Sequence, residues 1–108
     1  MGHVLVRRAS RQSGLARTTR HAYEALERLF PSPADASGCE FEAAVLVDEL
    51  GADLAGGLSR NGISTAALLA ADANVRSLES TECLTVPQRL ALAAVRECLE
   101  RWKLPLGS

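Results

Sequence analysis

The last quarter of the chain constrains the fold most strongly, because it carries the signals of one long helix. Thr85 and Gln88 have the spacing of a capping box, in which each side chain satisfies a backbone amide of the first turn. Pro87 suits that turn, since its missing N–H would have no partner there. We expect the helix to stop at Pro105. Its predicted apolar stripe consists of Leu92, Val95, Leu99 and Trp102, widened by Leu90, Ala94 and Cys98.

A second capping box, Ser37 with Glu40, predicts another helix in the middle of the chain. Gly51 occupies the place of a left-handed C-terminal cap, so this helix is expected to end there. Its apolar stripe consists of Phe41, Val45, Leu46 and Leu50.

Shorter helical segments are predicted between residues 53 and 78. Asp53 can cap the first, Ser64 or Thr65 the second, and Asp72 a single turn after it. The glycine pair at residues 56–57 weakens the first segment, so packing must hold it. The residues expected to face inward are Leu54, Leu58, Leu68, Leu69, Val75 and Leu78.

The scarcity of aromatic residues supports a helical core. Aromatics make up 4% of the chain, whereas hydrophobic residues make up 47%. The core must therefore consist of Leu, Val, Ile and Ala, which suits closely packed helices better than sheets. The sequence predicts an all-α fold, a compact bundle of about five helices with a long C-terminal helix, preceded by a basic N-terminal arm and a helix.

The chain divides into segments at its proline-rich and charged stretches. Residues 1–17 are expected to form the basic arm, and residues 18–30 a helix that Pro31 and Pro33 terminate. Residues 31–38 are expected to be a linker, residues 39–104 the helical bundle, and residues 105–108 a C-terminal tail.

Charge is distributed unevenly between these segments. Residues 1–30 contain six Arg and two acidic residues, a net +4, whereas residues 31–108 contain six basic and eleven acidic residues, a net −5. The basic segment has three interpretations: a mitochondrial or plastid transit peptide, an arm that binds an acidic surface or nucleic acid, or a solvated tail. The arginines that would contact a partner are Arg7, Arg8, Arg11, Arg17 and Arg20.

Three cysteines, an odd number without zinc-site spacing, bear on the cellular compartment. Cys83 and Cys98 are expected to be buried reduced thiols, which favours a reducing compartment. We therefore expect an intracellular, cytoplasmic protein, or a mitochondrial or plastid one if residues 1–30 include a transit peptide. No apolar run has the length of a membrane span.

The chain lacks the residue patterns of common catalytic sites. His3 and His21 lie in or beside the arm, away from the capped helices. Asp48 and Glu49 are adjacent on a helix and so point in different directions. The glycine pair lacks the residues of a phosphate-binding loop. We expect no enzyme activity, no cofactor and no metal site.

Residues 41–102 resemble a sterile alpha motif (SAM) domain. The resemblance rests on Leu50-Gly51, Leu58, Asn61-Gly62-Ile63, Leu68-Leu69, Val75 with Leu78, and the stretch from Leu84 to Arg89. Two departures are Phe41, where the family often has tryptophan, and the absence of a glycine before Arg89. The resemblance implies a five-helix bundle that associates with proteins, often with copies of itself head to tail.

The resemblance also implies two binding surfaces. The first lies at the start of the last helix and carries Gln88 and Arg89. The second is an acidic surface formed by Asp72, Glu79 and Glu82. The sequence thus predicts a non-catalytic protein–protein interaction module, a small adaptor or structural subunit of a larger assembly. The alternative is a nucleic-acid or nucleoprotein binder that uses the Arg-rich arm.

Overall fold

The structure is a computed structural model that describes the backbone of residues 2–59 and 62–107 and the side chains of residues 14–58 and 62–104. Its elements are α1 (Gly2–Arg28), the 3-10 helix η1 (Pro33–Asp35), α2 (Gly38–Ser59), α3 (Thr65–Glu79) and α4 (Val86–Gly107). No strand occurs in the two described ranges. The predicted all-α class is confirmed, with four long helices in place of about five.

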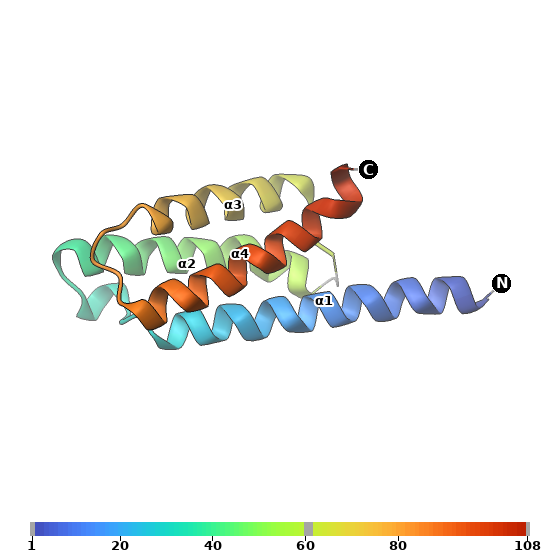
Figure 1. Ribbon diagram of the computed structural model, residues 1–108, viewed down its shortest axis with the longest axis horizontal. Helices are drawn as coiled ribbons and strands as arrows, with labels where there is room; N and C mark the ends of the chain where they lie inside the picture. The colour runs from blue at the N-terminus through green and yellow to red at the C-terminus, as the bar shows by residue number, and fades with distance from the viewer. Residues whose placement is uncertain (1, 60–61, 108) are drawn as a thin grey trace.

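The helices form an antiparallel bundle in which consecutive helices run in opposite directions (Figure 1). α1 packs against α2 and α4, and α3 packs against the same two helices. The N-terminal half of α1 projects beyond the other helices, which makes the molecule 55 Å long but only 23 and 22 Å across (Figure 1).

Residues 2–17, expected to form an arm, are the first part of α1, which continues without a break into residues 18–28. Ala16, Thr19 and Leu26 are buried on one face of this helix. Because these residues recur at helical spacing, packing extends the helix N-terminal to the predicted start at residue 18. The predicted stop is confirmed, since α1 ends at Arg28, just before Pro31.

α2 is one helix where the sequence predicts two. Gly51 does not cap it, because the only glycine with a positive φ among the described residues is Gly38, at 59°. Gly51 instead allows α1 to come close: a Cβ on Gly51 would lie 2.7 Å from Cζ of Tyr23. Gly57 similarly faces Ile63, whose Cβ would lie 2.8 Å from an added Cβ. These glycines are sites of close packing, and the helix continues through both.

α3 also joins two predicted segments. Of the two predicted caps, Ser64 is the one used, since the Ser64 hydroxyl accepts a hydrogen bond from the Ala67 amide at 3.2 Å. The helix then continues through Asp72, so the separate turn predicted to start at this residue does not form. Asp72 is buried within the helix. Leu68 is buried as predicted, but Leu69 is 63% exposed.

α4 begins with the predicted capping box. The Thr85 amide donates to Gln88 Oε1 at 2.8 Å, and the Gln88 amide donates to Thr85 Oγ1 at 3.2 Å. The predicted stop at Pro105 is wrong, because α4 extends to Gly107. A proline so near the end removes only one of the helix's many backbone hydrogen bonds, and its fixed φ is compatible with a helix.

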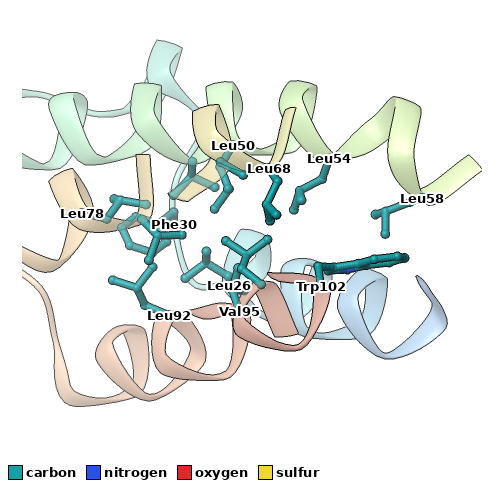
Figure 2. Packing of buried hydrophobic residues seen from close by; sticks show 14 of the residues in the cluster. Leu26, Phe30, Leu50, Leu54, Leu58, Leu68, Leu78, Leu92, Val95 and Trp102 are labelled. Carbon is teal, nitrogen blue, oxygen red and sulfur yellow. The ribbon is translucent and has the colours of Figure 1, made fainter. Parts of the chain in front are cut away.

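The core lies along the bundle axis and receives leucines from every long helix (Figure 2). Phe30 and Trp102 are its aromatic members. Its largest fully buried aliphatic side chains are Leu26, Leu50, Leu54, Val75, Leu78, Leu92, Val95 and Leu99. This composition agrees with the expectation of a core built from aliphatic residues.

A disulfide joins Cys39, in the first turn of α2, to Cys83, in the connection before α4. The expectation that Cys83 is a buried reduced thiol is therefore wrong: both half-cystines are exposed. Cys98 is free and buried, as expected. Residues 39 and 83 lie 44 positions apart, and they meet because α2 and α4 run in the same direction and so begin at the same end of the bundle (Figure 1). The cysteine argument for a reducing compartment thus loses its basis.

Candidate interaction surfaces

The outer face of α4 carries large apolar side chains that the core does not use. Val86, Leu90 and Leu104 are 69%, 67% and 71% exposed. The expectation that Leu90 and Ala94 widen the core stripe is wrong, because both are exposed. Leu90 is two residues from buried Leu92, so the two side chains point about 200° apart. Counting helical positions from Leu92 and Val95, which were predicted to be buried, would have placed Leu90 on the outer face from the sequence alone.

Ion pairs connect α3 to α4 and occupy two residues of the predicted acidic surface. Asp72 accepts from Lys103 Nζ at 2.8 Å and lies 3.1 Å from Arg76 Nε. Glu79 forms a two-bond pair with Arg96. The hydrogen bond from Lys103 holds the pKa of Asp72 below its ordinary value, against the opposing effect of burial. These carboxylates stabilise the bundle and are already paired with cations.

Gln88, predicted to contact a partner, is buried and used inside the fold. Besides the capping box, its Nε2 donates to the Leu29 carbonyl at 2.8 Å, which fixes the start of α4 against the end of α1. Arg89 is exposed, and its Nη2 donates to the Thr81 carbonyl at 3.1 Å. Glu82 is also exposed. Of the residues predicted for the two binding surfaces, Arg89 and Glu82 are therefore the ones that are exposed and outside the ion pairs between α3 and α4.

The arginines of the predicted arm lie on α1. Arg7, Arg8 and Arg11 belong to its N-terminal part, and their side chains are outside the described residues. Arg17 and Arg20 are exposed. Arg20 Nη2 donates to the Leu58 carbonyl at 3.2 Å, so part of its guanidinium binds the end of α2. The positive charge that the sequence assigns to an arm thus follows one continuous helix.

Much of the negative charge of the chain lies on α2. The sequence analysis divided the charge only between residues 1–30 and 31–108, and so did not assign it to this helix. Residues 38–59 contain five acidic residues and no Lys or Arg. Asp53 is half-buried and accepts from Asn74 Nδ2 at 2.8 Å. The acidic residues with exposed side chains are Glu40, Glu42, Asp48 and Glu49.

Polar groups inside the bundle are satisfied by neighbours. Trp102 Nε1 donates to Thr19 Oγ1 at 3.1 Å, and that hydroxyl donates to the Leu15 carbonyl at 2.7 Å. Burial raises the pKa of the Cys98 thiol, which therefore stays protonated and a weak nucleophile. Over the described side chains, each buried nitrogen or oxygen atom has a hydrogen-bond partner.

The contact between α1 and α2 centres on Tyr23. Its hydroxyl donates to the Val47 carbonyl at 3.1 Å. Burial, together with the negative charges of Glu27 and Asp48, raises the pKa of Tyr23 to about 12. The neutral phenol is therefore the form that the folded bundle holds.

The described residues contain neither a metal-binding cluster nor a membrane-spanning helix. Within the described residues, no group of three or more His, Cys, Asp or Glu side chains is arranged to hold a metal ion. None of the helices, over the same part of the chain, is both long and apolar enough to cross a bilayer.

Comparison with known proteins gives no relative: no family model, no curated protein and no solved structure matches the chain.

Proposed function

We propose that this chain is a non-catalytic protein–protein interaction module, a small adaptor or a structural subunit of a larger assembly. The observation that supports this proposal is the outer face of α4, with Val86, Leu90 and Leu104 in contact with solvent. The opposite face of α4 supplies the core, so these three side chains contribute little to folding. Burying such a helix face against a second protein is favourable, by about 25 cal/mol per Å² of apolar surface.

A pair of matched variants tests the proposal. Leu90→Ser removes an apolar side chain from this face, whereas Leu69→Ser removes a similarly exposed leucine from α3. Both variants should fold, because neither side chain is buried. Proteins that co-purify with the tagged full chain from its source cells would be quantified for each variant. We expect a subset to be lost with Leu90→Ser and kept with Leu69→Ser. The same co-purifying set in both variants would refute the proposal.

A second candidate function, nucleic-acid or nucleoprotein binding, is favoured by the projecting half of α1 (Figure 1). This part of the helix carries Arg7, Arg8 and Arg11, Arg17 follows where packing begins, and residues 1–23 contain no acidic residue. A basic helix that stands away from the acidic α2 can approach phosphates without repulsion from the rest of the molecule.

Salt dependence tests this second function. If three of these arginines contact phosphates, the logarithm of the affinity for duplex DNA should fall against the logarithm of salt with a slope of about −3. Fluorescence anisotropy with a labelled duplex and a labelled single strand measures that slope. Replacing Arg7, Arg8 and Arg11 together by alanine should flatten it, and Arg28→Ala, at the other end of α1, should leave it unchanged. Absence of salt-dependent binding would eliminate this function.

A further inference from the structure

The outer face of α4 has an apolar side chain at each end. Reflection about position 95 relates Val86 to Leu104 and Ala93 to Glu97, whereas Leu90 has Glu100 as its counterpart. With about 100° of rotation per residue, Val86, Leu90, Ala93, Glu97 and Leu104 fall within about 60° of arc. Each of these residues is exposed. Val86 and Leu104 lie at the two ends, and Val95, buried on the opposite face, marks the height of the midpoint. This face, defined by those five exposed residues, is called the α4 stripe.

From this arrangement we propose that the α4 stripe pairs with the α4 stripe of a second copy of this chain, antiparallel, about a twofold axis at the height of Val95. This inference rests on the proposed function and names the partner of the same surface. The axis places Val86 of one copy opposite Leu104 of the other, twice. Because a twofold interface uses the same patch on both copies, the patch must complement itself, and an apolar residue at each end meets that condition.

Charges beside the stripe are complementary under the same symmetry. Arg89 and Glu100 lie on the same flank of the α4 stripe, about 60° and 40° from its centre. In an antiparallel pair, each flank faces the same flank of the second copy. Reflection about position 95 therefore brings Arg89 of one copy next to Glu100 of the other, twice. Both side chains are exposed, and Arg89 uses one nitrogen for the Thr81 carbonyl. Glu100 lies 3.0 Å from Lys103 Nζ and 3.6 Å from Arg96 Nη1, and its side chain remains 53% exposed, so Arg89 of the second copy would add a third cation to this carboxylate.

The middle of the stripe limits the strength of the pair. Ala93 of each copy faces Glu97 of the other, and the small alanine leaves room for a carboxylate that already pairs with Arg101 at 3.0 Å. The stripe is about 27 Å long and about 10 Å wide, so each copy contributes about 300 Å². Stable interfaces bury about 800 Å² per partner. The pairing is accordingly weak and depends on concentration.

Sedimentation equilibrium of the full chain tests the pairing, from about 10 µM to about 1 mM, where a weak complex dissociates and forms. The weight-average mass of the unmodified chain should rise from monomer toward dimer over that range. Leu90→Ser should keep the mass near monomer, whereas the control Leu69→Ser should behave as the unmodified chain does.

Charge reversal tests the register of the pair. Arg89→Glu and Glu100→Arg should each weaken dimerisation by about three- to tenfold, because each change places like charges opposite one another twice. The double variant should recover most of the loss. Circular dichroism checks that Glu100→Arg still folds, because Glu100 also accepts from Lys103.

Three results would overturn the inference: a monomer mass at every concentration, equal effects of Leu69→Ser and Leu90→Ser, or no recovery in the double charge variant. A chain that stays monomeric but loses a co-purifying protein with Leu90→Ser would refute self-pairing and leave the proposed function standing.

Discussion

Two alanine substitutions in α2 are expected to change stability in opposite directions. Alanine is about 1 kcal/mol more favourable than glycine inside a helix. At Gly56, an added Cβ would meet no atom within 4 Å. Gly56→Ala should therefore raise the free energy of unfolding by up to about 1 kcal/mol.

Gly51→Ala should lower stability, because α1 occupies the space of the new methyl group. The Cβ would lie 2.7 Å from Tyr23 Cζ, so the rigid ring must move before it reaches ordinary contact distance. That movement breaks the hydrogen bond to the Val47 carbonyl, a loss of about 1 kcal/mol. Repacking adds a cost of about 1–3 kcal/mol. After the helix-propensity gain, the net loss is about 1–3 kcal/mol.

Thermal and urea unfolding followed by circular dichroism measure the difference between the two variants. We expect about 2–4 kcal/mol between them, and each kcal/mol shifts the melting temperature by about 4–8 °C in a domain of this size. Tyr23→Ala provides the control, since Gly51→Ala in that background should become stabilising. Equal stabilisation by both alanines, or no rescue by Tyr23→Ala, would refute the close contact between α1 and α2.

Three further outcomes are expected from contacts between distant parts of the chain. Cys83→Ser, or reduction of the Cys39–Cys83 disulfide, should lower the free energy of unfolding by about 3–4 kcal/mol, because the unfolded chain then no longer contains a closed loop between two cysteines 44 positions apart. Calorimetry with and without reductant measures this loss. The pKa of Asp72 is lowered in the fold, so its contribution is present above the ordinary value of 3.8 and is lost as pH falls through the folded-state pKa. Asp72→Asn should therefore reduce stability at neutral pH and flatten the acid limb of a pH–stability curve, and an unchanged acid limb would contradict the pairing with Lys103. Gln88→Ala removes the side-chain oxygen that accepts from the Thr85 amide and the hydrogen bond to the Leu29 carbonyl, for an expected loss of about 1–2 kcal/mol in urea unfolding.

Local signals determined much of the secondary structure from the sequence alone. The cap at Thr85 is where the sequence placed it, and Ser64 is one of the two caps proposed for α3, because a cap depends on side chains within one turn. The buried stripe from Leu92 to Trp102 also follows from helical spacing. The scarcity of aromatic residues correctly indicated an aliphatic, helical core.

Features that depend on neighbours distant in sequence required the tertiary structure. Gly51 looks like a helix cap until Tyr23 of α1 is seen to occupy the space beside it. Residues 1–17 looked like a separate arm because their sequence is rich in Arg, Ser and Thr and offers no clear apolar stripe at helical spacing. Asp72 was predicted to belong to an exposed acidic surface, but it is paired with Lys103 of α4, a neighbour distant in sequence.

What the sequence alone determined, then, is the helical class, the caps and the apolar character of the core, since each arises from interactions within a few residues. The tertiary structure decided which apolar residues are left outside. Leu90 and Leu92 have the same chemistry, yet one contacts solvent and the other the core, because the directions from which α1 and α3 pack select a single face of α4. The pairing of Cys39 with Cys83 has the same origin: the antiparallel order of the helices sets which distant residues meet.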